Sequence, residues 1–366
     1  MAERPETPEA AAALLKSLGA SGQSVRPFGG GTKPWGPPAE GVELDTGGLG
    51  RVLEHNVGDF TAILQAGVPL AEAQAAFAQE GQMLALDPAL GEGDAATIGG
   101  IMATGDSGPL RHRYGGVRDL VVGTMVALSD GTLARSGGKV IKNVAGYDLG
   151  KLFTGSFGTL GLIVQVAVRL HPRTETVSAV GSAEDTDRLG AAARALAGHP
   201  LEAECLDVAW REGSGRLLAR FAGAAADRQA AACVERMEGA GLEACESVAD
   251  DDELWAAQRA GQRGACVLKV AGRVTDLPAV CALGFPLVGR TAHGLYWLSL
   301  PAEADAVRGA REALAPRACT LLDAPAALRA DAWPPVAPGT LALMARVKER
   351  FDPARSFRPG TFVGGI

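Results

Sequence analysis

Several common features are absent from this sequence, and each absence excludes a class of protein. In 366 residues, no apolar run approaches the roughly 20 residues that a membrane-spanning helix needs. The opening stretch MAERPETPEAAAALLKSLGA carries acidic side chains and no apolar core, so it indicates an amphipathic helix and not a secretory signal. A formal net charge of -7, with no long basic stripe, argues against a nucleic-acid partner.

Cysteine pairs are absent as well. The six cysteines all lie in the second half of the chain and none forms a CxxC motif. They are Cys205, Cys233, Cys245, Cys266, Cys281 and Cys319. Zinc sites and iron–sulfur clusters need thiolates spaced so that they converge on one centre, so we expect no metal site. Scattered cysteines are typical of reduced core residues in a cytoplasmic protein.

Glycine, in contrast, is abundant and unevenly distributed. The chain has 49 glycines, and they crowd into residues 26–50, 91–116 and 137–161. Because apolar segments separate these runs, the pattern favours backbone brought close to a ligand over one flexible linker. Three ordinary glycine-rich turns are the alternative.

The first run contains RPFGGGTKPWG, residues 26–36. A Rossmann loop needs GxGxxG opening directly into a helix, but Pro34 and Pro37-Pro38 oppose any helix longer than a turn. The phosphate loop of NTPases needs GxxxxGK followed by Ser or Thr, which neither this run nor the segment at 137–140 supplies. Consecutive glycines can instead turn several backbone N–H groups toward an anion. We therefore predict an anion-binding nest that includes the Thr32 hydroxyl.

The first half of the chain predicts a mixture of strands and helices. The segment 61–68 predicts a strand, and LAEAQAAFAQEGQ predicts a helix that ends at Gly81. Residues 119–135 predict a β-hairpin that turns at Ser129-Asp130-Gly131. LIVQVAVRLHP, after Gly161, predicts a further strand.

The second half differs in texture, with alanine-rich helices between short strands and no visible internal repeat. This pattern favours strands packed against two helices on one face, a ferredoxin-like arrangement. We predict an α+β protein with domains at 1–175 and 176–340. Residues 341–366 form the tail, and its proline-rich stretch FDPARSFRPGTF, 351–362, is expected to pack against the protein without forming an element of its own.

Taken together, the glycine runs resemble the FAD-binding domain of the vanillyl-alcohol oxidase superfamily, also called the PCMH-type domain. The resemblance covers roughly residues 20–175. Its motifs are Arg26-Pro27-x-Gly-Gly-Gly-Thr, Thr97-Ile98-Gly99-Gly100 with Ala103-Thr104-Gly105, Arg113-Tyr114-Gly115 with Arg118-Asp119-Leu120, and Gly158-Thr159-Leu160-Gly161. Further similarity, to the shorter E-type flavoprotein subunits of bacterial glycolate oxidases, is carried by Lys142-Asn143-Val144-Ala145-Gly146-Tyr147-Asp148 and by Phe351-Asp352-Pro353 with Pro359-Gly360.

This resemblance implies the roles of several residues. Domain 1–175 would be a two-lobed FAD-binding domain, 176–340 a smaller α+β cap, and the tail would return near the flavin. The FAD pyrophosphate would meet the backbone N–H groups of Phe28, Gly29, Gly30, Gly31 and Thr32. A second wall would be formed by Thr97, Ile98, Gly99, Gly100, Thr104 and Gly105. The adenine end would be lined by Gly161 and Ile163.

Other residues in the family motifs have less defined roles. Arg113, Tyr114 and Asp148 lie in motifs close to the cofactor, whereas Arg118 and Asp119 are equally consistent with stabilising the fold. Family members that tether flavin covalently often place a histidine in or near the first glycine loop. Since residues 26–36 contain none, we expect non-covalent FAD.

The sequence departs from the catalytic D-type relatives in its second half. Those relatives carry a histidine- and acid-rich metal motif, HxGDGN, which has no counterpart here. Phe157 stands where they usually carry an acidic residue, and Arg358 stands where an asparagine commonly precedes Pro-Gly. Arg259 and Arg358 are candidates for holding a carboxylate, because arginine binds carboxylates bidentately. His112 and His293 are candidate bases, with core or surface histidine as the alternative.

Three functions therefore stay open. The first is an FAD-binding subunit of a complex that oxidises glycolate to glyoxylate, in which this chain is an electron relay. The resemblance implies a second, D-type FAD subunit and an iron–sulfur subunit as partners, in the cytoplasm or at the inner face of the membrane through them. The second is a self-sufficient FAD-dependent 2-hydroxy-acid dehydrogenase, and the third is a scaffold whose FAD is structural. The apolar segment 331–344 is a candidate partner surface, with simple packing as the alternative.

Overall fold

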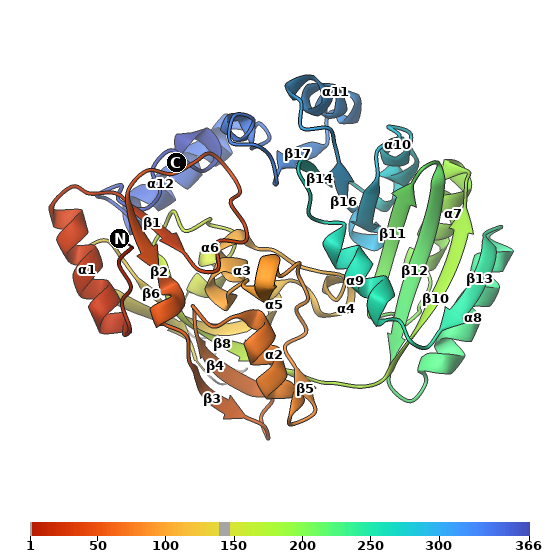
Figure 1. Ribbon diagram of the computed structural model, residues 1–366, viewed down its shortest axis with the longest axis horizontal. Helices are drawn as coiled ribbons and strands as arrows, with labels where there is room; N and C mark the ends of the chain where they lie inside the picture. The colour runs from red at the N-terminus through yellow and green to blue at the C-terminus, as the bar shows by residue number, and fades with distance from the viewer. Residues whose placement is uncertain (1, 139–146) are drawn as a thin grey trace. The chain divides into compact units, whose positions relative to one another are not determined.

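The computed structural model describes residues 2–138 and 147–366, and it divides the chain into two compact units. Unit 1 consists of Met1–Ser107, Gly115–Arg173 and Pro335–Ile366, and unit 2 of Gly108–Tyr114 and Thr174–Pro334. Helices and strands occur in both units, so the predicted α+β class is confirmed (Figure 1).

Unit 1 is built on an antiparallel sheet with the strand order β3-β4-β8-β6-β7, five strands among the described residues. A separate parallel pair joins β1 to β2, and a short pair joins β5 to β9. The strands are β1 Val25–Phe28, β2 Val42–Asp45, β3 Val52–Asn56, β4 Thr61–Gln65, β5 Gln82–Met83, β6 Val121–Ala127, β7 Leu133–Gly137, β8 Leu162–Arg169 and β9 His171–Pro172. The helices are α1 Pro8–Ala20, α2 Leu70–Ala78, α3 Ile98–Thr104, α5 Val117–Leu120, α6 Leu149–Phe153 and α12 Pro338–Phe351.

Local sequence signals account for several of these elements. The predicted amphipathic helix is α1, which begins after the N-cap Thr7 and buries Leu15 and Leu18. The predicted hairpin is formed by β6 and β7, and its turn contains Gly131 at φ +85°. The helix expected to end at Gly81 is α2, which ends earlier, at Ala78. Gly81 instead has φ +64° in the turn that leads into β5.

Unit 2 contains one eight-stranded antiparallel sheet, in the order β13-β10-β12-β11-β15-β16-β14-β17. Its strands are β10 Thr176–Ala183, β11 Cys205–Arg211, β12 Ser214–Ala222, β13 Glu243–Val248, β14 Val267–Ala271, β15 Leu287–Arg290, β16 Leu295–Ser299 and β17 Ala318–Leu321. Its helices are α4 Arg111–Tyr114, α7 Thr186–Ala197, α8 Ala226–Gly239, α9 Asp252–Ala260, α10 Leu277–Cys281 and α11 Ala304–Leu314.

The strand order shows a repeat that the sequence does not display. Strands β10 to β13 with α7 and α8 form one βαββαβ unit, and β14 to β17 with α10 and α11 form a second. Each has the ferredoxin-like order, with its first and third strands central. The four helices pack on one face and share one apolar core with the strands (Figure 1). The ferredoxin-like prediction is therefore correct, but the arrangement occurs twice.

Charged side chains are buried where the two repeats meet. The register of β11 with β15 places Asp207 opposite Arg290, and both are fully buried. The Arg290 guanidinium lies 3.9 Å from Asp207 Oδ2, donates to Gln262 Oε1 at 2.9 Å and lies 4.3 Å from the Trp297 ring centroid. Nothing in the sequence pattern singled out this pair, because its two members are distant in the chain.

The first part of the tail, up to Phe351, belongs to α12. The proline-rich stretch that follows packs into unit 1 as an irregular segment, as expected. Phe357 is fully buried in the cluster that contains Leu15 and Leu44, and it bridges to Val25 of β1. The buried Lys348 of α12 donates to the Phe357 carbonyl at 2.8 Å and to the Thr159 carbonyl at 2.7 Å. The tail is thereby fixed to two separate segments of unit 1. Among residues 2–138 and 147–366, no helix combines the length and the apolar character needed to cross a membrane.

Candidate functional site

A cavity in unit 1 brings together residues from all parts of the first half of the chain and from the tail. Its empty volume, including the open mouth, is about 810 Å³, a size typical of small-molecule and cofactor sites. The lining residues are Pro27, Phe28, Gly29, Gly30, Gly31, Thr32, Lys33, Trp35, Thr46, Ala66, Thr97, Gly99, Gly100, Ile101, Ala103, Thr104, Phe157, Gly158, Gly161, Leu162, Ile163 and Arg358.

The glycine loop after β1 forms the first wall, and its packing explains why glycine is needed. A Cβ at Gly29 would lie 2.2 Å from Thr97 Oγ1, and one at Gly30 would lie 1.8 Å from the Ala95 carbonyl oxygen. Gly31 has φ +66°, a conformation that glycine adopts without steric cost. Within the described part of the chain, the backbone N–H groups of these three glycines make no hydrogen bond. Unpaired N–H groups at a cavity wall suit an anion.

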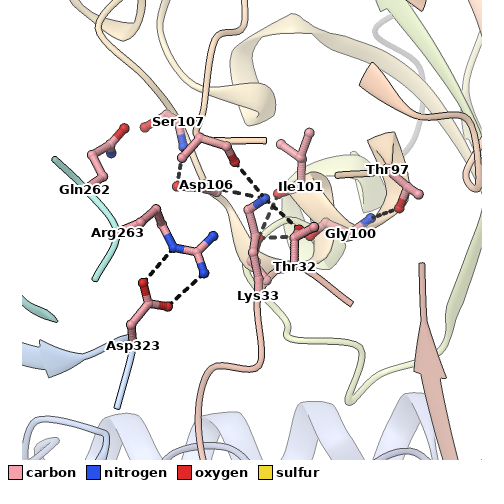
Figure 2. A network of polar contacts seen from close by, with 12 residues as sticks. Thr32, Lys33, Thr97, Gly100, Ile101, Asp106, Ser107, Gln262, Arg263 and Asp323 are labelled. Carbon is pink, nitrogen blue, oxygen red and sulfur yellow. Dashed lines mark hydrogen bonds and ion pairs between the residues drawn. The ribbon is translucent and has the colours of Figure 1, made fainter. Parts of the chain in front are cut away.

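The second wall is the start of α3, against which the glycine loop packs. Thr97 is the N-cap of α3, and its hydroxyl oxygen accepts from the Gly100 N–H at 3.2 Å (Figure 2). Gly99 donates its N–H to the Ala66 carbonyl at 2.7 Å, and a Cβ there would lie 2.7 Å from the Ala66 Cβ. Thr104 donates its hydroxyl to the Gly100 carbonyl at 2.9 Å. This wall therefore presents main chain and small side chains to a ligand.

A buried ion pair stands at the edge of the cavity. Lys33 Nζ lies 3.6 Å from Asp106 Oδ2, and the two side chains are only 5% and 7% exposed. Lys33 also donates to the Ala89 carbonyl at 3.3 Å. Figure 2 shows its ammonium group pointing toward Asp106. These contacts hold Lys33, and with it the end of the glycine loop, because breaking them would leave an unpaired buried charge.

The third wall comes from the segment before β8 and from the tail. Phe157 has φ +55°, donates its N–H to the Ala103 carbonyl at 2.8 Å and stacks on Phe362 with ring centroids 5.3 Å apart. Gly161 packs closely, since a Cβ there would lie 3.1 Å from the Ala127 carbonyl oxygen. Arg358 lies beside Gly158 and lines the cavity as well.

Most of the predicted cofactor residues meet at this cavity, but not all of them line it. Ile98 is 1% exposed and packs into the core behind α3, and Gly105 is the left-handed C-cap of that helix. Asp148 is the N-cap of α6 and accepts from the Lys151 N–H at 3.2 Å. The stretch Lys142–Gly146 lies outside the described residues. Asp119 accepts from the Gly116 N–H at 2.9 Å, which is a role in the fold.

Arg113 and Tyr114 lie in Gly108–Tyr114, a short segment from the first half of the chain that belongs to unit 2. Tyr114 donates its hydroxyl to the Glu204 carboxylate, and Arg113 donates to the Glu202 carbonyl at 3.3 Å. Tyr114 also packs against the cluster around Trp255, and burial raises the pKa of its hydroxyl. Neither side chain is among the described residues that line the cavity.

The candidate catalytic residues Arg259 and His293 also lie in unit 2. Arg259 is half-buried in the last turn of α9. His293 is exposed, its Nε2 lies 3.3 Å from the Arg111 carbonyl oxygen, and its ring centroid is 5.8 Å from that of His112. Arg358 is thus the one weak catalytic candidate found in the cavity among the residues that the structure describes.

His112 gives unit 2 an acid-sensitive point. Burial, and secondarily the nearby His293, lower the pKa of His112 to about 4 from 6.5. The unfolded chain therefore takes up a proton first as the pH falls from 6.5 toward 4, and the folded state loses stability across that window. We expect the free energy of unfolding to fall by about 2 kcal/mol between pH 7 and pH 4.5. Urea denaturation at both pH values measures this loss.

The matched variant for this prediction is His112→Leu, which removes the titrating group and keeps an apolar side chain. The pH-dependent loss should shrink in H112L by the contribution of His112, while an H55L variant should retain it. An identical pH dependence in wild type and H112L would contradict the assignment.

Residues that sequence reasoning missed in the cavity include Lys33, Trp35, Thr46 and Ala66. Lys33 and Trp35 stand within the quoted glycine stretch, so their position carried a signal. Thr46 and Ala66 carried none, because their contribution depends on where η1, Thr46–Gly48, and the end of β4 lie in the fold.

The six cysteines are core or near-core residues. Five are buried, Cys245 is half-buried, and none forms a disulfide within the described residues. Burial raises the pKa of Cys233 and of Cys281 to about 12, which leaves both as unreactive thiols at neutral pH. Within the described residues, no group of three or more histidine, cysteine or acidic side chains converges as metal ligands would.

Comparison with known proteins finds similarity over the first part of the chain. Residues 2–137 match the family described as FAD binding domain. The glycolate oxidase subunit GlcE of Escherichia coli is 38% identical over 138 residues, which is 38% of this chain and 39% of that protein. The glycolate oxidase subunit GlcD of Bacillus subtilis is 37% identical over 155 residues, 42% of this chain and 33% of that protein. A mitochondrial D-lactate dehydrogenase [cytochrome] of Arabidopsis thaliana is 36% identical over 170 residues, 46% of this chain and 29% of that protein.

These matches span well under half of each relative's own length. A broader likeness is seen among solved structures. An alkyldihydroxyacetonephosphate synthase superposes with a TM-score of 0.72 over 98% of this chain and 76% of that chain, at 16% sequence identity. At that identity the likeness concerns the fold alone.

Proposed function

Because residues 2–137 match the family described as FAD binding domain, we propose that the chain is an FAD-carrying subunit of a complex that oxidises glycolate to glyoxylate. The observation that carries the proposal is the cavity of unit 1, in which three glycines present unpaired N–H groups beside a wall of small residues. A Cβ at Gly29 would collide with Thr97 of that wall and one at Gly30 with the Ala95 carbonyl, so glycine lets the loop pack closely and leave its main chain at the cavity. Bound FAD would supply a redox centre that accepts electrons and passes them on.

Different residues of the cavity would contact different parts of this cofactor. The N–H groups of Gly29, Gly30 and Gly31 suit the pyrophosphate, as oriented backbone dipoles suit other phosphates. The segment Thr97–Gly100 forms a second face at which small residues permit close approach. Gly161 and Ile163 suit the adenine end, where backbone groups can recognise the base. With no histidine in residues 26–36, the attachment is non-covalent.

Within this function, the chain acts as an electron relay. Among residues 2–138 and 147–366, the ionisable side chains that line the cavity are those of Lys33 and Arg358, and both are cations. Such groups bind anions, whereas removal of the glycolate hydroxyl proton needs a base near the reacting carbon. We therefore place glycolate oxidation on a partner that supplies this base, and electron transfer on this chain.

The proposed partners are a D-type flavin subunit and an iron–sulfur subunit. Both of the glycolate oxidase relatives are named as subunits. The proposed contact surface includes the apolar segment 331–344, where Leu343 of α12 is 52% exposed. Attachment to the inner face of a membrane would then pass through these partners.

A second candidate function, a self-sufficient 2-hydroxy-acid dehydrogenase, is favoured by one observation. The D-lactate dehydrogenase of Arabidopsis thaliana matches a longer stretch of this chain than the GlcE subunit does, 170 residues against 138.

An anaerobic absorption titration separates the two functions. We expect the purified chain to show a flavin spectrum that stays oxidised with glycolate or D-lactate alone and bleaches when a D-type subunit is added with glycolate. Bleaching by either acid without a partner would favour the self-sufficient enzyme. The absence of a flavin band after reconstitution with FAD would contradict both.

A further inference from the structure

The backbone of Arg358 is held in a conformation that arginine does not favour. Its φ is +43°, in the left-handed region that glycine and asparagine tolerate far better than long side chains. Three contacts hold it there: its N–H donates to the Val25 carbonyl at 3.0 Å, and its carbonyl accepts from the Thr361 N–H at 3.3 Å and from the Thr361 hydroxyl at 2.8 Å. Strained residues of this kind concentrate at ligand sites.

The charge of Arg358 has no carboxylate partner among the described residues. The neighbouring cations do have one, since Arg26 pairs with Glu43 and Lys33 with Asp106. The Nε of Arg358 is buried and makes no hydrogen bond. Burial, and secondarily the charge of Arg26, lower the pKa of its guanidinium. Arg358 as a whole is half-buried, and a partly buried cation without a counter-charge is unfavourable, so this position suits an anion.

That anion has a place to bind, because Arg358 lines the same cavity as the glycine loop. A Cβ added to Gly158 would lie 3.6 Å from the Arg358 Cδ. Gly158, Gly161 and Arg358 all line the cavity. Backbone N–H groups donate to an anion but carry no net charge, so they leave a dianion uncompensated. A guanidinium in the same cavity provides the missing positive charge and binds phosphate oxygens with its fork of donors.

We propose that Arg358 is the counter-charge for the pyrophosphate of FAD and does not hold a substrate carboxylate. This inference rests on the proposed function only in that the chain binds FAD. Arg358 is then a binding residue whose uncompensated charge is balanced when the cofactor is present.

The test compares Arg358→Asn and Arg358→Gln with wild type, using the full chain freed of flavin. Binding of FAD is followed by quenching of its fluorescence, and ADP, which carries the pyrophosphate without the flavin ring, is measured by competition. We expect R358N and R358Q to weaken FAD and ADP by the same factor, tenfold or more. The salt dependence of FAD binding should become shallower, because one charged contact is lost. The melting temperature of the flavin-free R358N protein should be equal to or above that of wild type.

Arg355→Asn is the matched control, since Arg355 is exposed, lies in the same tail and has φ +51°. It should leave both affinities within twofold of wild type. Unchanged FAD affinity in R358N would overturn the inference, and so would weakened FAD with unchanged ADP, because the charge would then act elsewhere on the cofactor. A lower melting temperature of the flavin-free R358N protein would also overturn it, since it would show a structural role. Failure of the wild-type chain to bind FAD would instead refute the proposed function.

Discussion

A Gly30→Ala variant is expected to lose FAD binding by 100-fold or more, about 2.7 kcal/mol of binding free energy. The added methyl group would lie 1.8 Å from the Ala95 carbonyl oxygen and 2.5 Å from its carbon. Both are main-chain atoms, so the glycine loop itself has to move away from the segment before α3. The N–H groups of Gly29 to Gly31 would then no longer converge on the pyrophosphate. Fluorescence titration of the flavin-free variant with FAD measures the loss.

The control for this prediction is Gly93→Ala, in the segment that precedes Ala95. Gly93 has φ +61°, and a Cβ there meets nothing within 4 Å. G93A therefore introduces only local backbone strain, of about 1 kcal/mol, and FAD binding should stay within threefold of wild type. Wild-type affinity in G30A would show that the loop does not hold the cofactor. Equal losses in both variants would show that the effect is general destabilisation.

The sequence predicted the walls of the site because their signals are local. The glycines at Gly30, Gly99 and Gly161 mark close backbone approach, and their motif order resembles the family described as FAD binding domain, which residues 2–137 match. The hairpin of β6 and β7 and the ferredoxin-like pattern after residue 175 were predictable for the same reason, since turn residues and periodicity act over short distances.

The remaining features depend on contacts between distant residues. The Lys33–Asp106 pair joins residues from two different loops, and Arg358 reaches the cavity because the tail bridges to β1. The duplication in unit 2 was missed, because a repeated strand order needs no repeated side chains beyond an apolar alternation. Thr46 and Ala66 reach the cavity only through the fold. None of these placements has a local signature.

Loss of the Lys348 ammonium should cause the largest change in stability. In Lys348→Met, we expect the free energy of unfolding to fall by about 3–5 kcal/mol, the usual cost of breaking a buried ion pair. Lys348 Nζ donates to Asp352 Oδ2 at 2.7 Å, to the Thr159 carbonyl and to the Phe357 carbonyl, and the two side chains are 5% and 0% exposed. Methionine keeps the aliphatic stem but leaves Asp352 charged and both carbonyls unpaired. Urea denaturation at pH 7 measures the change.

The exposed pair of Lys151 and Asp148 is the control for the buried pair of Lys348 and Asp352. Lys151→Met removes a lysine that lies 3.3 Å from Asp148, but those side chains are 50% and 51% exposed, so its loss should cost less than about 1 kcal/mol. In the double variant K348M/D352L, the buried charge is gone as well, and part of the stability should return. The recovery will be incomplete, because Asp352 also accepts from the Ser356 and Phe357 N–H groups at 3.1 and 2.8 Å. If K348M and K151M had the same free energy of unfolding, the tail would be held by Phe357 alone. Arg358 would then reach the cavity without the contacts of Lys348.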